Sequence, residues 1–200
     1  MTTFPAYASN FEIFPKESEV TRHLSPLLSL LKRIDFTLRV DDPGVNQGQM
    51  VSDFDFALKQ ALLACGATTC KLPLPPDVPQ ELDFAFVLGE RSVAVEIEKA
   101  NREKILRDIL KCHMYLHAGA DFALVVLPKN YPHTHGVWNL FEFGVRRFGE
   151  CQKYGFGTPD KLGRILLLGF EQFCAATGVP LSQKTRSEMR TRAAAHGGRP

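Results

Sequence analysis

The stretch that most constrains the fold of this chain is ELDFAFVLGERSVAVEIEKAN, which spans residues 81–101. Apolar side chains recur at every second position on either side of Gly89-Glu90. A period of two is typical of β-strands, and a pair that begins with glycine favours a tight type II′ hairpin turn. The sequence therefore predicts an antiparallel hairpin formed by ELDFAFVL and SVAVEIE.

The position of the turn decides which residues face one another across the hairpin. With the turn at Gly89-Glu90, Asp83 lies directly opposite Glu96. Strand alternation places Glu98 on the same face as both. Because Cβ atoms of directly opposed residues are about 4.5–5.5 Å apart, we expect three carboxylates to converge on one patch of the sheet.

Both faces of the hairpin carry apolar residues. Leu82, Phe84, Phe86, Val93, Val95 and Ile97 share one face, and Ala85, Val87 and Ala94 accompany the carboxylates on the other. Opposed like charges destabilise a sheet, and burying unpaired carboxylates costs more. A divalent cation would relieve both costs, and carboxylate oxygens suit Mg²⁺, Mn²⁺ or Ca²⁺ better than zinc. The alternative is a solvent-exposed polar face whose carboxylates pair with nearby Lys and Arg.

The remaining pattern predicts an α/β fold. We expect helices from Ser25-Pro26, from Ser52 to Gly66, over 101–119 and over 137–150, and further strands over 67–72, 121–128 and 164–170. An antiparallel run, then a crossover helix, then a strand able to pair in parallel gives a mixed β-sheet flanked by helices.

Length and composition fit a single domain. The chain has 200 residues and a net charge of only +2, so charge alone does not indicate a polyanion-binding protein. We expect a core over about 50–170 and a peripheral basic tail over 180–200. The odd count of five cysteines and the absence of a signal-peptide pattern favour a reducing, cytoplasmic location. No apolar run approaches the roughly 18 residues of a membrane span.

An acidic residue on one hairpin strand, Glu-x-(Lys/Glu/Gln) on the next and a following helix resemble the core of the PD-(D/E)xK nucleases. The resemblance is to the BglII/BstYI type of type II restriction endonucleases. It begins near Gly48-Gln49-Met50, is strongest over 83–128, and includes RILLLGF. It implies a restriction-endonuclease-like fold and a Mg²⁺-dependent endonuclease, in which Mn²⁺ can replace Mg²⁺. It also implies a homodimer that cuts double-stranded DNA at a short palindrome.

The same resemblance assigns roles to individual residues. Asp83 and Glu96 become metal ligands, with the carbonyl of Ile97 placed to assist. Glu98 stands where much of the superfamily has lysine, similar to the BamHI variant. Two roles remain open for Glu98, a general base that activates water and a further metal ligand.

The helix over 101–119 offers candidate DNA contacts. Lys104, Arg107 and Lys111 have helical spacing that puts them on one side, where they could approach phosphates. The alternative is an ordinary solvated helix face. His113 is a further candidate contact in the same helix. Asp55 could add an acidic group, although Ser52-x-x-Asp55 also fits a helix capping box.

Three other functions compete with a restriction endonuclease. A repair or mobile-element nuclease of the same fold would recognise DNA structure rather than sequence. A DNA-binding module with a degenerate site would bind without cutting, and the departure at Glu98 suits that reading. A metal-binding protein would have no nucleic-acid role.

Overall fold

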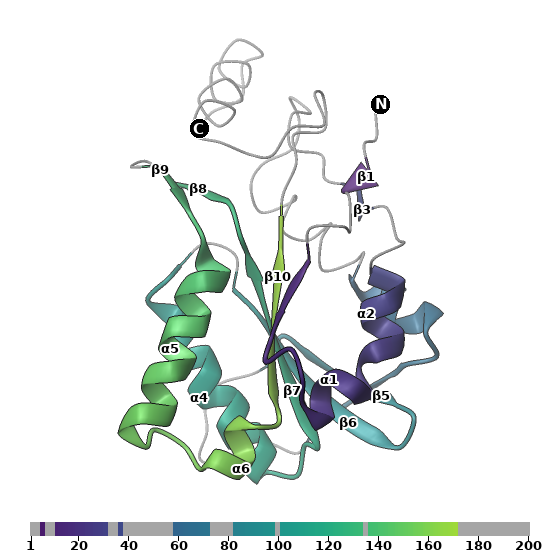
Figure 1. Ribbon diagram of the computed structural model, residues 1–200. Coiled ribbons are helices and arrows are strands. Elements are labelled where there is room, and N and C mark those ends of the chain that lie inside the picture. The colour runs from purple at the N-terminus through teal and green to yellow at the C-terminus, as the bar shows by residue number, and fades with distance from the viewer. Residues whose placement is uncertain are drawn as a thin grey trace.

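The computed structural model describes residues 5–6, 11–31, 36–37, 58–72, 82–98, 101–133 and 136–171. Its centre is a six-stranded mixed β-sheet flanked by helices (Figure 1). In order across the sheet the strands are β2 (Glu12–Phe14), β10 (Ile165–Phe170), β7 (Phe122–Pro128), β6 (Arg91–Ile97), β5 (Phe84–Leu88) and β4 (Thr68–Cys70). The predicted α/β class with a mixed sheet is therefore confirmed.

The sheet combines a parallel centre with antiparallel edges. Strands β6, β7 and β10 are parallel neighbours, whereas β4, β5 and β6 form the predicted antiparallel run and β2 is antiparallel to β10. Parallel neighbours need a crossover connection. Helix α4 (Lys104–His117) connects β6 to β7, and α5 (Leu140–Tyr154) with α6 (Pro159–Leu162) connects β7 to β10.

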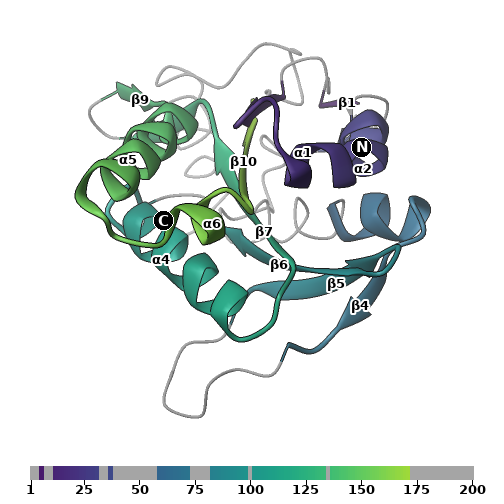
Figure 2. The same ribbon diagram turned by 60° about the horizontal axis from the view of Figure 1, so that its bottom comes forward.

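Helices cover both faces of the sheet. Helices α4, α5 and α6 lie on one face, and α1 (Glu19–His23) and α2 (Ser25–Leu31) lie on the other (Figures 1 and 2). Each side has its own apolar cluster, and helical residues 58–64 join the cluster beneath α1 and α2. Two small pairs stand apart from the main sheet: β1 (Pro5–Ala6) with β3 (Phe36–Thr37), and β8 (Tyr131–His133) with β9 (Gly136–Trp138).

The hairpin has the predicted register. Phe84 faces Val95 and Ala85 faces Ala94, and Gly89 in the turn has the positive φ of 62° that favours glycine. Val95 packs beneath α1 and α2, whereas Ala94 packs beneath α4. The predicted placement of Leu82 is wrong, because Leu82 packs on the α4 side. Strand β5 begins only at Phe84, so the alternation does not extend back to Leu82.

Other expected elements differ at their ends. The helix expected over 137–150 begins at Leu140, because the Asn139 side chain caps it by accepting from the backbone N of Glu142. Helix α5 ends at Tyr154, and Gly155 follows in the left-handed conformation. The strand expected over 67–72 is confirmed as β4, and α2 begins at Ser25 as expected. Of the helix expected between Ser52 and Gly66, residues 58–64 are helical, and the part that contains Asp55 lies outside the described residues.

The described elements that were not predicted are β1, β2, α1, β3, the two strands of the β8–β9 hairpin and α6. They are short, and short segments carry little periodicity. Val20 of α1 and the following Leu24 are nevertheless fully buried, so residues before position 50 contribute to the core. The four cysteines of the described part, Cys65, Cys70, Cys112 and Cys151, are free. No helix in that part is both long and apolar enough to cross a bilayer.

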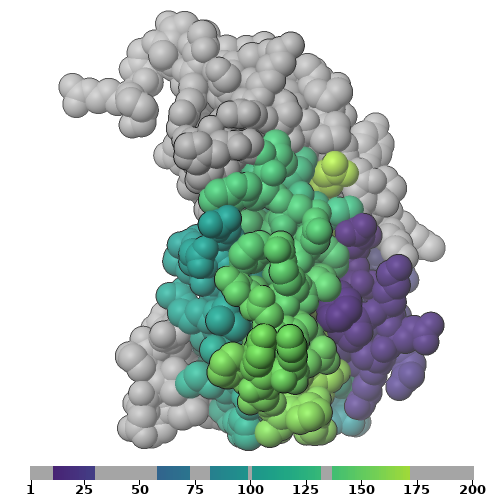
Figure 3. Space-filling view, turned by 60° about the vertical axis from the view of Figure 1, so that its left-hand side comes forward, coloured from purple at the N-terminus to yellow at the C-terminus, as the bar shows by residue number. Residues whose placement is uncertain are grey.

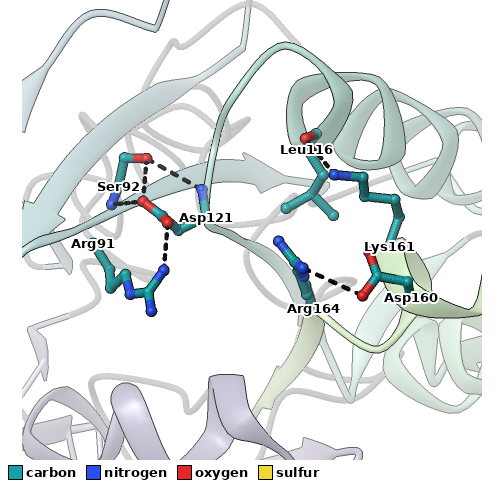
Figure 4. Close-up of polar contacts among 7 residues, drawn as sticks. All are labelled: Arg91, Ser92, Leu116, Asp121, Asp160, Lys161 and Arg164. Atoms are coloured by element: carbon teal, nitrogen blue, oxygen red, sulfur yellow. Dashed lines mark hydrogen bonds and ion pairs between the residues drawn. The ribbon is translucent and has the colours of Figure 1, made fainter.

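Polar contacts join the strands at the end of the sheet where β6 and β7 begin. Asp121 accepts hydrogen bonds from the backbone N of Ser92 at 2.9 Å, from its Oγ at 3.0 Å and from Arg91 at 2.8 Å (Figure 4). Burial opposes ionisation of Asp121, but these bonds prevail and lower its pKa. Nearby, Lys161 donates to the carbonyl of Leu116 at 3.0 Å. Both carboxylate oxygens of Asp121 at this end of the sheet therefore accept hydrogen bonds.

We predict opposite effects for two glycine-to-alanine changes. A Cβ on Gly169 of β10 would lie 2.6 Å from Phe141 Cγ, so Gly169→Ala should destabilise the protein by about 1–3 kcal/mol through overpacking. A Cβ on Gly149 within α5 would meet nothing within 4 Å, so Gly149→Ala should stabilise by about 0.5–1 kcal/mol. Chemical denaturation measures both. Equal effects of the two changes would contradict the described contact between β10 and α5.

Candidate active site

The predicted carboxylates lie where β5 begins and β6 ends. Asp83 immediately precedes β5, and its Oδ2 accepts a hydrogen bond from the backbone N of Ile97 at 2.6 Å. The negative charge of Asp83 also contributes to raising the pKa of Glu96. This bond places Asp83 at the end of β6. Because the paired ladder begins only with Phe84 and Val95, the prediction that Asp83 lies directly opposite Glu96 on the same face stays a prediction, as does its role as a metal ligand.

Glu96 is a buried carboxylate on the face of β6 that α4 covers. Its side chain is only 4% exposed, and Lys111 of α4 donates to its Oε2 at 2.7 Å. The other oxygen, Oε1, is buried without a hydrogen-bond partner among the described residues. Burial raises the pKa of Glu96 to about 7, against the opposing effect of Lys111. Glu96 thus has one satisfied oxygen and one unsatisfied oxygen.

Asp108 of α4 is an acidic member of the cluster that the sequence analysis missed. It is 4% exposed, and burial raises its pKa to about 6. The charge of Glu98 raises this pKa further, whereas Lys111 and Arg107 oppose the increase. Asp83 also interacts with Asp108, and the charge of Asp108 in turn raises the pKa of Glu96. Asp108 therefore couples electrostatically to all three predicted carboxylates.

Glu98 is buried just beyond the end of β6. Its backbone N donates to the carbonyl of Val126 on β7 at 3.1 Å. Its Oε1 accepts from the backbone N of Asn101 at 2.9 Å, in the turn that leads into α4. The side chain is 8% exposed. These contacts tie Glu98 to the parallel neighbour of its strand and to the start of the helix that carries Asp108.

The predicted DNA contacts on α4 separate into three environments. Lys104 and Arg107 are exposed, as a phosphate contact requires. Lys111 is 8% exposed and pairs with Glu96, so it does not belong to a solvent-facing stripe. The Nε2 of His113 accepts from the backbone N of Thr158 at 2.9 Å, and this bond holds the loop after α5. The roles of Lys104, Arg107 and His113 toward DNA stay predictions.

A signal for Asp108 is present in the sequence of α4. Ile105, Asp108, Ile109 and Cys112 follow the i, i+3, i+4, i+7 spacing of a buried helix stripe, and all four are buried. A charged residue at such a position is rare unless it is paired. The sequence signal for Asp108 is therefore a charged residue that interrupts the apolar stripe of the helix.

The chemistry of this donor set, which consists of carboxylate oxygens, suits a hard divalent cation. Within the described ranges, no group of three or more His, Cys, Asp or Glu has the geometry to hold a metal ion. Lys111 supplies the positive charge next to Glu96 instead. The unpaired Oε1 of Glu96 is the feature that fits a cation best, because a buried carboxylate oxygen without a partner is costly.

Comparisons with known proteins add no family assignment. No protein-family model matches the chain, and no curated protein matches it.

We predict that the metal-free protein loses stability as the pH rises from 5 to 7.5. In the folded protein the pKa of Glu96 is raised from 4.5 to about 7, and the pKa of Asp108 is raised from 3.8 to about 6. Both carboxyl groups therefore keep their protons to a higher pH in the folded state than in the unfolded state. The folded state therefore binds more protons in this window, and deprotonation costs it on the order of a few kcal/mol. Thermal unfolding in a chelator at several pH values measures the loss.

The matched control is the double variant Glu96→Gln/Asp108→Asn, which removes both titrating groups. Its stability should vary little between pH 5 and 7.5, whatever its absolute value. A wild-type protein that becomes more stable over this range would show that the two carboxyls are not protonated in the fold.

Proposed function

We propose that this protein is a Mg²⁺-dependent endonuclease of the restriction-enzyme type that hydrolyses phosphodiester bonds in double-stranded DNA. The observation that carries the proposal is the electrostatic coupling of four acidic residues, Asp83, Glu96, Glu98 and Asp108, at a site where a buried lysine, Lys111, contacts Glu96. A structural ion pair needs one acid for each base, and further buried acids lower stability. Glu96 Oε1 has no hydrogen-bond partner among the described residues, and Asp108 contacts the base Arg107 only at the long distance of 3.7 Å. Such incompletely satisfied acids are what a cation-dependent site requires.

The order of elements also supports the proposal. A hairpin that bears the carboxylates, a crossover helix α4 and a parallel strand β7 occur in the sequence order of the PD-(D/E)xK core that the chain resembles. We infer a restriction-endonuclease-like fold from that order together with the sequence motif. A fold alone does not specify an activity, so the proposal depends on the site.

The oxygen ligands present fit Mg²⁺, with Mn²⁺ as a substitute. Asp83 and Glu96, with the carbonyl of Ile97, would hold the ion. When bound, such an ion polarises a phosphoryl oxygen and makes a coordinated water more acidic. The hydrogen bond from the backbone N of Ile97 fixes the orientation of the Asp83 carboxylate before any ligand arrives.

Side chains of the protein would activate the attacking water and stabilise the charge that develops on the phosphoryl group. Glu98, held by Asn101, would orient the attacking water or accept its proton. Lys111 brings a cation from α4 to the site, where the strand itself has Glu98 instead of a lysine. It would shift from Glu96 toward the negative charge that develops on the phosphoryl group. Two copies related by a two-fold axis would place two such sites on a palindrome in the cytoplasm.

A second candidate is a DNA-binding module without catalysis. The pair between Lys111 Nζ and Glu96 Oε2 favours it, because this contact neutralises Glu96 without a metal ion. Such a module would bind duplex DNA and leave it intact.

We predict discrete fragments when unmethylated plasmid or phage DNA is incubated with the protein and Mg²⁺. Glu96→Gln should reduce cleavage by at least about 100-fold, because it removes a metal ligand. Glu90→Gln is the matched control, since Glu90 is an exposed residue in the hairpin turn at the far end of β6, and it should cut normally. Sequencing the new ends gives the specificity and the cut position.

Intact DNA across varied sequences with metal-loaded protein would refute the nuclease. Preferential cutting of branched or mismatched DNA would point to the repair or mobile-element class instead.

We further predict that Lys111→Met separates metal binding from catalysis. Removing the cation next to Glu96 should tighten Mn²⁺ binding several-fold in calorimetry. It should also slow single-turnover cleavage by about 100-fold, because the transition state loses a positive charge. Lys111→Arg should recover part of the rate. A purely structural lysine would lower both measurements together, and that result would remove Lys111 from the proposed site.

A further inference from the structure

Three arginines and two aromatic residues form a cluster between the turn before α4 and the first half of α5. This arginine–aromatic cluster consists of Arg102, Trp138, Phe143, Arg146 and Arg147. The guanidinium carbons of Arg102, Arg146 and Arg147 lie 5.7, 4.9 and 5.0 Å from the ring centroid of Phe143. Arg102 also lies 4.8 Å from the ring centroid of Trp138. Two segments of the chain, the turn before α4 and helix α5, therefore bring positive charge to one ring.

Internal contacts neutralise this charge only in part. Arg102 pairs with Glu103 at 3.0 Å, but both side chains are substantially exposed. Arg147 pairs with Glu150 at 2.7 Å. Arg146 is exposed and has no ion pair with any described residue. Attraction of an exposed cation to a ring is worth only about 0.5–1 kcal/mol, so the gathering of like charges is better explained by an anionic partner than by stability.

The cluster presents groups that suit phosphates. A guanidinium held over a ring keeps N–H groups at its edge, where two of them can donate to two oxygens of one phosphate. Phe143 and Trp138 restrict the side chains on one side and so reduce the entropy lost on binding. Several arginines on adjacent elements match a polyanion with regularly spaced charges, which is a nucleic-acid backbone.

The cluster lies next to the candidate active site. Asn101, the neighbour of Arg102, donates from its backbone N to Glu98 at 2.9 Å. Helix α4 follows β6, and α5 follows β7 after the β8–β9 hairpin. Both helices therefore return from the edge of the sheet where β6 and β7 end, which is the edge with the carboxylates. Figure 3 shows the surfaces of α4 and α5 side by side on one face of the molecule. A duplex bound at the carboxylates would therefore lie within reach of the cluster.

We propose that the arginine–aromatic cluster binds the phosphate backbone of duplex DNA and holds it beside the carboxylates. This inference rests on the proposed nuclease function, since it supplies the backbone contacts that such a nuclease needs. It assigns these contacts to Arg102 and Arg146 above all, because Arg147 is largely engaged by Glu150.

The test is DNA binding at a series of salt concentrations, with wild-type protein in a chelator so that no DNA is cut. Fluorescence anisotropy with a labelled duplex gives Kd at each concentration. Arg146→Gln and Arg102→Gln should each weaken binding about tenfold at low salt. Each should also reduce the slope of log K against log salt by about one, as the loss of one phosphate contact requires.

Arg91→Gln is the matched control. Arg91 also carries an ion pair, with Asp121, and lies 6.0 Å from the ring of Phe122, but it is at the opposite end of β6 (Figure 4). The control should leave Kd and the salt slope unchanged. Equal losses for Arg91→Gln and Arg146→Gln would show only an effect of net charge and would overturn the inference.

Two further results would also overturn it: an unchanged slope in both cluster variants, or a change in oligomeric state by light scattering without a change in slope. The latter would make the cluster a protein interface. Cleavage of DNA with Mg²⁺ by variants whose slope is unchanged would refute the cluster and retain the nuclease. Reduced slopes in a protein that cuts no DNA would refute the nuclease and support the cluster.

Discussion

The pairing of β5 with β6 determines which side chains reach the candidate site. Side chains alternate between the faces of a strand, so a slip of one residue would move every one of them to the other face. In the observed register Val95 points to the α1–α2 side and Glu96 is left on the α4 side. The same register brings Asp83 to the backbone of Ile97. The pairing therefore leaves Glu96 on the face that α4 covers and brings Asp83 to the end of β6.

The contact between Lys111 and Glu96 shows what the fold does with a buried acid. Removing a carboxylate and an ammonium group from water is expensive, and one good hydrogen bond seldom offsets the cost. Hydrophobic side chains in their place would be at least as stable. The buried pair of Lys111 and Glu96, together with buried Asp108 one turn earlier in α4, is therefore easier to explain by a role in binding or catalysis than by a contribution to stability.

The sequence predicts the parts of the site that depend on local periodicity. The hairpin, its register and the shared end of Asp83 and Glu96 follow from a period of two and one turn. The burial of Lys111 could not be predicted in the same way, because it depends on how α4 rotates over β6. The arginine–aromatic cluster is still harder to predict. It joins a turn at Arg102 with Phe143 on α5, and only tertiary packing brings them together.

The two ends of β6 place acidic residues in opposite situations. At the beginning of the strand, Asp121 accepts three hydrogen bonds, and its pKa is lowered. At the end of the strand, the pKa values of Glu96 and Asp108 are raised, and one oxygen of Glu96 has no partner among the described residues. The same sheet can therefore satisfy a carboxylate fully where only stability is needed. At the other end, buried acids with incomplete hydrogen bonding lower the stability of the fold. Proteins keep such destabilising groups where they bind a ligand or take part in a reaction.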